Sequence, residues 1–110
     1  MLPESEIEKL FNAQKLLTVE AAKTQTKEYT DKVTNVLQGL TKTDAEGNSV
    51  PFTQQDLQNL TYEDVANQLA GEFGALSETT RRTIFQTMLN NAVRTERYSL
   101  TPEEVAEFAR

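Results

Sequence analysis

The sequence predicts an all-α fold, in which one long N-terminal helix precedes a bundle of about four shorter helices. Three observations support this prediction. Residues 4–38 contain neither proline nor glycine and are rich in Glu, Lys, Gln and Ala. The stretch 77–97 carries the densest apolar pattern of helical period in the chain. Signals for the start of a helix recur near residues 53, 61, 77 and 101.

The composition of the chain narrows the range of possible functions. The 110 residues, 37% of them apolar, suffice for one domain with one modest core. Since Cys and His are absent, there is no disulfide framework, and zinc and most transition metals lack their usual ligands. No apolar run approaches the roughly 20 residues of a membrane span, and the N-terminus does not resemble a secretion signal. We expect a soluble intracellular protein in the cytoplasm, or in a virion if a phage encodes it.

The predicted first helix, within residues 1–38, is unusual in its length and in its apolar residues. About 35 residues at 1.5 Å each span roughly 50 Å, whereas a compact domain of this size is only about 35 Å across. The helix therefore either breaks near residues 24–26, with both halves on the core, or extends beyond its own domain. Six large apolar residues point in nearly all directions around its first half: Ile7, Leu10, Phe11, Leu16, Leu17 and Val19. If this half protrudes, another chain must cover them.

Residues 39–52 predict a loop or a short β-hairpin at 41–50. Gly39 is expected to end the first helix. Asp44–Gly47 suits a type I turn with Gly47 in the left-handed conformation. We expect residues 41–43 to pair with residues 48–50 on either side of this turn.

Residues 53–110 predict the helical bundle. Thr53, Thr61 and Thr101 are each followed three residues later by an acid, as in a capping box, and Ser77 starts a weaker version. From Thr61 we expect a helix with these inward-facing residues: Val65, Ala66, Leu69, Ala70 and Phe73. The helix within 77–97 carries apolar residues over about half its circumference: Ile84, Phe85, Met88, Leu89, Ala92 and Val93. We therefore expect it to lie centrally, with neighbours on two sides.

Charge is segregated along the chain, whose net charge is −6. All lysines precede residue 43, all arginines follow residue 80, and residues 43–80 hold seven acids and no base. Such a layout either steers a charged partner or pairs the acidic middle with the arginine-bearing helix inside one fold. Arg81 falls inside the apolar arc of its helix. Its side chain either extends past the edge of the core to solvent or forms an interfacial ion pair.

The sequence contains few candidates for a catalytic or metal-binding site. Glu63 and Asp64 form a carboxylate pair, but acids in a first helical turn are explained by the helix dipole. Asp44, Glu46 and Asn48 are spaced like the first ligands of a calcium loop, yet the glycine and the bidentate glutamate of such a loop are missing. No phosphate-binding loop or nucleophile motif occurs. We therefore predict no enzyme activity, no cofactor and no metal site.

Nucleic acid is an unfavoured partner, because the arginines at 81, 82, 94 and 97 spread over several faces of one helix in an acidic chain. We predict instead a non-catalytic role in a larger protein assembly, through self-association or binding of a protein partner. The predicted contact residues are Ile7, Leu10, Phe11, Leu16, Leu17 and Val19, with Glu63, Asp64 and Arg81 as polar candidates. The alternative is an acidic inhibitor, a nucleic-acid mimic that binds a basic protein through the carboxylates of residues 44–78. The composition is similar to that of phage structural and assembly proteins in general, without pointing to one family.

Overall fold

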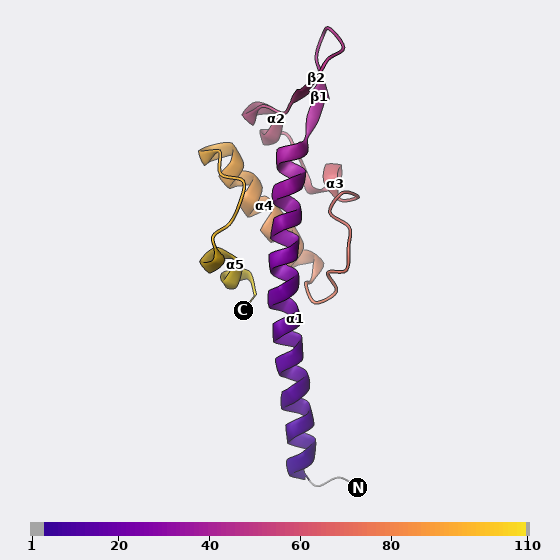
Figure 1. Cartoon of the computed structure of the whole chain (residues 1–110), viewed down its shortest axis with the longest axis vertical. Helices are drawn as coiled ribbons and strands as arrows, with labels where there is room; N and C mark the ends of the chain where they lie inside the picture. The colour runs from indigo at the N-terminus through magenta and orange to yellow at the C-terminus, as the bar shows by residue number, and fades with distance from the viewer. Residues whose placement is uncertain (1–3, 110) are drawn as a thin grey trace.

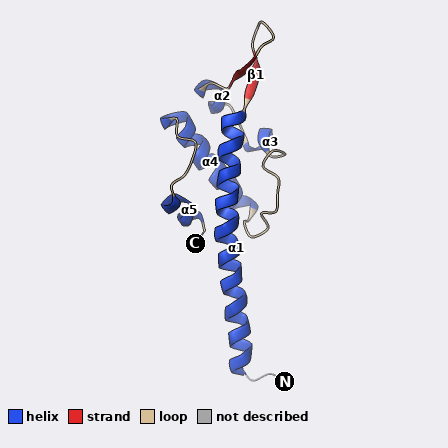
Figure 2. Ribbon diagram, viewed as in Figure 1, coloured by secondary structure: helices blue, strands red, loops and turns tan. Residues whose placement is uncertain are grey.

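The mostly helical fold with a small antiparallel hairpin is confirmed (Figures 1 and 2). A computed structural model describes the backbone of residues 4–109 and the side chains of residues 4–10 and 19–109. Within that range the elements are α1 (Glu4–Gly39), β1 (Thr41–Thr43), β2 (Ser49–Pro51), α2 (Gln54–Gln58), α3 (Tyr62–Val65), α4 (Glu78–Thr95) and α5 (Pro102–Phe108).

Helix α1 is continuous over 36 residues and extends well past the rest of the molecule (Figure 1). The chain measures 73 × 25 × 17 Å, and its radius of gyration is 18.5 Å, against about 13 Å for a compact chain of this length. The alternative of a break near residues 24–26 is therefore wrong. Thr26 fits into the helix because its hydroxyl donates to the carbonyl oxygen of Ala22, one turn earlier, at 2.6 Å.

Helix α4 lies at the centre of the body and packs against α1, α2 and α3, as its wide apolar arc predicts. Its buried residues are Ile84, Phe85, Met88, Leu89 and Ala92, with Val93 partly buried. From α1 the core receives Tyr29, Val33 and Leu37. Helix α5 packs on α1 beside α4 and closes the body on that side (Figure 1).

Two threonines on α1 are buried in this core. Thr26 and Thr30 are 0% and 2% exposed. Their hydroxyls remain satisfied, because Thr26 donates to the Ala22 carbonyl and Thr30 donates to the Lys27 carbonyl at 2.9 Å. The buried face of α1 therefore contains polar residues as well as apolar ones.

Local sequence determines where the shorter helices begin. Thr53, Thr61 and Thr101 each form a complete capping box at the start of α2, α3 and α5. Ser77 caps α4 through the amide of Thr80. These four starts agree with the sequence prediction.

Two local predictions need correction. In the hairpin, Thr41 pairs with Pro51 and Thr43 with Ser49, so the second strand begins one residue later than expected. The reason is that Asn48 closes the turn, accepting a hydrogen bond at its carbonyl from the Asp44 amide at 2.9 Å, with Gly47 at φ 85°. The helix from Thr61 is also shorter than expected: α3 ends at Val65.

Beyond α3 the chain continues as turns. Leu69 and Phe73 are still buried, as predicted, whereas Ala70 is exposed. The Phe73 ring lies so close over Gly71 that a Cβ there would approach Phe73 Cε2 to 2.7 Å. This turn segment reaches α1, where Lys32 donates to the Ala70 carbonyl. After α3 ends, the segment is therefore held by its buried side chains and by its contact with α1, and not by further helical hydrogen bonds.

Candidate protein-binding surface

The protruding part of α1, residues 4–20, is here called the arm. Every side chain that the structure describes in the arm, at residues 4–10 and 19–20, is exposed. The large apolar side chains Ile7, Leu10 and Val19 are 52%, 61% and 39% exposed. The other predicted contact residues, Phe11, Leu16 and Leu17, lie outside the described side chains. The arm therefore presents apolar surface to solvent on a continuous helix.

The body covers α1 only from about residue 21 onward. Ala21, Ala22 and Gln25 are partly buried, and full burial starts at Thr26. Gln25 marks the lower edge of the body, where its side-chain oxygen accepts from the Ala75 amide at 2.8 Å. Val19 lies six residues before Gln25, nearly two helical turns below this edge, on the helix face that becomes core-facing in the body. Its exposure results from where the body stops.

Exposed ion pairs lie on the arm and at its junction with the body. Lys9 lies 3.6 Å from Glu6, and Lys23 lies 3.6 Å from Glu20. Both pairs join residues three apart on a solvent-facing helix, where such a pair contributes only about 0.2–0.5 kcal/mol. These charges are consequently free to exchange partners when another chain approaches.

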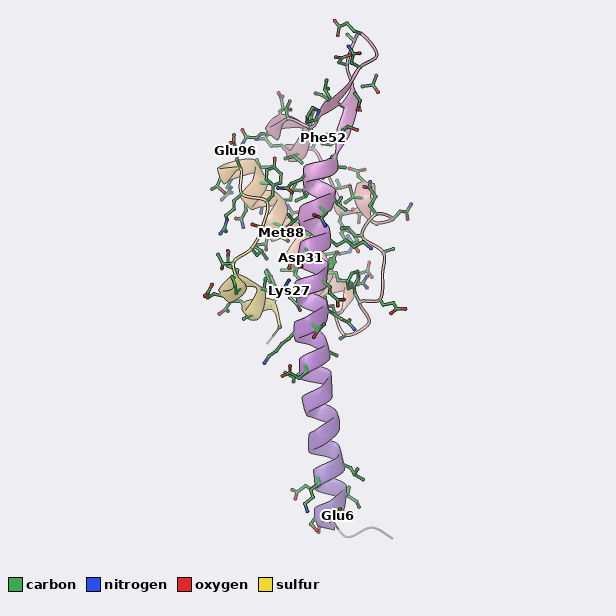
Figure 3. All side chains as sticks on the ribbon, in the orientation of Figure 1. Glu6, Lys27, Asp31, Phe52, Met88 and Glu96 are labelled. Atoms are coloured by element: carbon green, nitrogen blue, oxygen red, sulfur yellow. The ribbon has the colours of Figure 1, made fainter. Side chains whose placement is uncertain are left out.

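A groove of about 450 Å³ runs between α1 and α5, where the arm meets the body. The α1 wall is charged, with Lys23, Lys27 and Asp31, and Lys27 bonds to Asp31 at 3.0 Å (Figure 3). The opposite wall is apolar and consists of Leu100, Pro102, Val105, Ala106 and Ala109. The apolar part of the groove is therefore supplied by residues 100–109 and not by α1.

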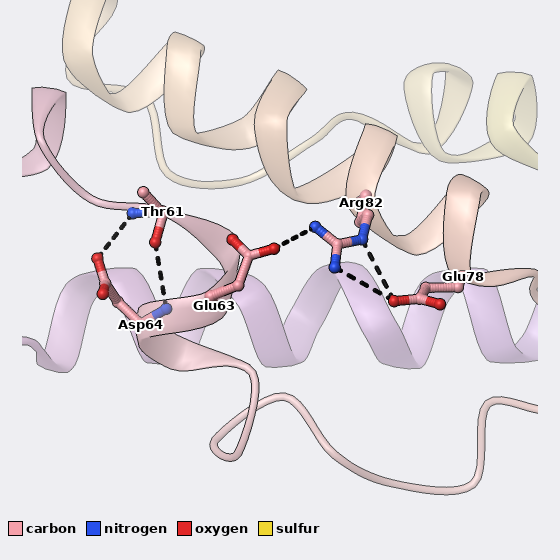
Figure 4. A network of polar contacts seen from close by, with 5 residues as sticks. All are labelled: Thr61, Glu63, Asp64, Glu78 and Arg82. Atoms are coloured by element: carbon pink, nitrogen blue, oxygen red, sulfur yellow. Dashed lines mark hydrogen bonds and ion pairs between the residues drawn. The ribbon is translucent and has the colours of Figure 1, made fainter.

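The predicted polar residues Glu63 and Asp64 take part in contacts within the chain (Figure 4). Asp64 accepts a hydrogen bond from the Thr61 amide at 2.9 Å as part of a capping box. Glu63 pairs with Arg82 at 2.5 Å, and Arg82 also pairs with Glu78 at 3.2 Å. The Arg82 guanidinium lowers the pKa of the Glu63 carboxyl below its ordinary value. Here the acidic middle and the arginine-bearing helix face each other inside one fold.

Arg82, rather than Arg81, forms the ion pairs at this place. The guanidinium of Arg82 also lies 4.6 Å from the centre of the Tyr62 ring. Arg81 is partly buried, and its Nε has no hydrogen-bond partner among the described residues. Sequence reasoning missed Arg82, although Glu78 four residues earlier is a usable signal for a helical ion pair.

The Tyr29 hydroxyl is the second buried polar group without a hydrogen bond in the described part of the chain. Burial is the main cause that raises its pKa above the ordinary value, and the phenol of Tyr62 adds to this. The charges of Arg81 and Arg82 act in the opposite direction. With its pKa raised, the phenol of Tyr29 stays protonated, and the residue serves as an aromatic side chain of the core. Its ring is in edge contact with the ring of Phe73, with 5.0 Å between the two ring centres.

Little in the described residues suggests bond-making chemistry. Among the side chains that the structure describes, those of residues 4–10 and 19–109, no group of three or more carboxylates, histidines or cysteines is arranged to hold a metal ion. Asp44, the first residue of the calcium-like spacing, instead caps its turn: its Oδ1 accepts from the amides of Glu46 and Asn48 at 3.0 and 2.8 Å. In the same part of the chain, no helix is long and apolar enough to span a bilayer.

Comparisons with known proteins give no assignment, because no protein-family model, curated protein or solved structure matches this chain.

Proposed function

We propose that this chain is a non-catalytic component of a larger protein assembly and that it contacts its partner through the arm. The observation that carries the proposal is the exposure of Ile7 and Leu10 on a helix that leaves the body. Single exposed apolar residues are common on protein surfaces. Here they occur on an element that has no body beside it, so covering them requires another chain.

The geometry of α1 favours binding over a purely structural role for the arm. The helix is anchored in the core by Tyr29, Val33 and Leu37, and it continues without interruption into solvent. A partner therefore meets a preformed helix face and does not have to order a flexible segment, which reduces the entropic cost of association. The compositional similarity to phage assembly proteins is in keeping with such a role.

The test is a double substitution in the arm, Ile7→Glu with Leu10→Glu. We expect complex formation to be lost, because burying two carboxylates in an apolar interface is unfavourable. The thermal midpoint of unfolding is expected to change by less than a few degrees, because neither residue contacts the core. Complex formation is measured by sedimentation velocity and by co-purification from the native host, and unfolding by circular dichroism.

The matched control is Gln55→Glu with Gln58→Glu, which adds the same charge at two exposed positions of α2. This control is expected to leave complex formation unchanged. If the arm variant and the control behave alike, the arm is not the contact surface and the proposal is wrong.

The acidic-inhibitor alternative receives less support. Several of its carboxylates already serve the fold: Asp44, Asp56 and Asp64 cap turns or helices, and Glu63 and Glu78 pair with Arg82. Under this alternative, Glu63→Lys with Asp64→Lys would weaken a strongly salt-dependent complex with a basic protein. Binding that is insensitive to salt would favour the arm.

A further inference from the structure

We propose that the arm's partner is a second copy of this chain and that the two α1 helices pair antiparallel over residues 4–27. This inference rests on the proposed function, because it takes the arm as the contact surface. It is carried by a row of residues with coiled-coil spacing on α1, which contains the exposed Ile7 and Leu10, and by charges that match only in the antiparallel orientation.

The row has the spacing of a coiled-coil seam. Ile7 and Leu10 are three residues apart and both exposed. In the sequence, the same alternation of three and four residues continues through Gln14, Leu17, Ala21 and Thr24. Each helix of a coiled coil presents such a row to its partner.

This row is not the continuation of the core-facing side of α1. At 100° per residue, its mean direction differs by roughly 110° from that of the buried residues Tyr29 and Val33. Past the arm, the row continues through exposed Thr24 and Glu28. Around the helix, the row lies between two places where the body borders α1. On one side Gln25 bonds to Ala75, and on the other side lies the groove beside α5. The strip is therefore open to a second helix even beside the body.

A symmetric antiparallel pair follows when Leu10 of one copy is placed opposite Ala21 of the other. Ile7 then faces Thr24 of the second copy, and the sequence positions Gln14 and Leu17 face each other at the centre. In this register Glu6 lies beside Lys27 of the second copy, and twofold symmetry produces the pair twice. A parallel pair along the same row brings Glu6 beside Phe11 and yields no opposite-charge pair.

The charge distribution along α1 favours the same orientation. Residues 4–9 hold three glutamates and one lysine, whereas residues 15–27 hold three lysines and one glutamate. Antiparallel pairing places the acidic end of one helix against the basic segment of the other. The side chains of Glu6 and Lys27 are 51% and 72% exposed, and their present partners, Lys9 and Asp31, are 75% and 64% exposed. Exchanging these weak pairs costs little.

Charge reversal tests both the partner and the orientation. Glu6→Lys alone and Lys27→Glu alone each place like charges together twice in the homodimer, so each variant is expected to dimerise roughly fivefold to tenfold more weakly than the original chain. A mixture of the two variants has opposite charges at both places and is expected to regain dimerisation as a heterodimer. Sedimentation equilibrium measures the association, and native mass spectrometry of one tagged variant identifies the heterodimer.

Cysteine crosslinking checks the register without changing charge. The chain has no cysteine, so Leu10→Cys and Ala21→Cys introduce single thiols. A short thiol crosslinker is expected to join Leu10→Cys to Ala21→Cys in a mixture, and to join neither variant to itself. Homodimeric crosslinking of Leu10→Cys would show a parallel pair and overturn the proposal.

The outcomes separate this inference from the proposed function. A chain that stays monomeric at all concentrations, with no recovery in the mixture of charge variants, overturns the second-copy inference. If Ile7→Glu with Leu10→Glu still abolishes capture of a different host protein, the arm remains the contact surface. If that variant changes nothing at all, both proposals fail together.

Discussion

The two halves of α1 form one unbroken helix, yet they have opposite environments. In the upper half, Tyr29 and Val33 are fully buried against α4 and its neighbours, whereas in the arm Ile7 and Leu10 are more than half exposed. Their side chains are chemically similar, so hydrophobicity alone does not distinguish the halves. The difference is that the body supplies a partner for one face of the upper half and ends near residue 21.

Helix formation and burial are therefore separate properties of α1. Local propensity and the absence of Pro and Gly make the whole segment helical. Burial depends on which face meets another element. Stability should therefore depend on the upper half and association on the arm.

The largest difference is expected between truncating one apolar residue of the arm and truncating one of α4 in the core that buries the upper half of α1. Phe85→Ala removes a side chain with 0% exposure and is expected to lower the free energy of unfolding by about 3–5 kcal/mol. Leu10→Ala is expected to change it by less than about 0.5 kcal/mol at concentrations low enough to keep the chain monomeric. Urea denaturation followed by circular dichroism measures both. A large loss from Leu10→Ala would mean that the arm folds back onto its own body.

A smaller effect is expected at the starts of the short helices, which lie in the body. Thr101→Ala removes the hydroxyl that accepts the Glu104 amide at 3.2 Å and should cost about 1 kcal/mol. Thr101→Ser should retain most of the stability, because the accepting oxygen is kept. Equal losses in the two variants would show that the methyl group, and not the cap, matters at this position.

We expect acid to lower the stability of the body by protonating the carboxyls of Asp56 and Glu104. Hydrogen bonds from Lys42 and the Thr53 amide lower the pKa of Asp56 to about 2, and hydrogen bonds from Arg97 and the Thr101 amide lower the pKa of Glu104 to about 2. Because both folded-state values lie below the ordinary 3.8 and 4.5, their stabilisation is complete above about pH 4.5. It is lost as the pH falls toward 2.

We therefore expect the thermal midpoint of the body to fall between pH 4.5 and pH 2, and to fall less steeply in the variant Asp56→Asn with Glu104→Gln. Glu72→Gln, at an exposed position outside the capping boxes, serves as the control and should retain the original slope. Thermal melts at a series of pH values measure the effect. An unchanged slope in the double variant would remove these two ion pairs as its cause.

Much of the fold could be read from the residues themselves. The caps at Thr53, Thr61, Ser77 and Thr101 were predictable because each is decided within three or four residues of chain. The central place of α4 followed from the width of its apolar arc. The ion pair of Arg82 with Glu63 was not foreseen, because Glu63 lies 19 residues away and reaches Arg82 only in the folded chain.

Local sequence accounts for the elements themselves: a long helix without breakers, a turn at Gly47 and capped short helices, all governed by contacts within a few residues. Which face of α1 is covered, and at which residue that cover ends, depends on the packing of the folded chain. Those outcomes depend on contacts between distant residues, such as the Thr34 hydroxyl with the Tyr98 carbonyl at 2.6 Å, 64 residues apart. A periodic pattern indicates that a face is apolar, but the neighbour that buries it comes from elsewhere in the chain or, as proposed for the arm, from a second copy.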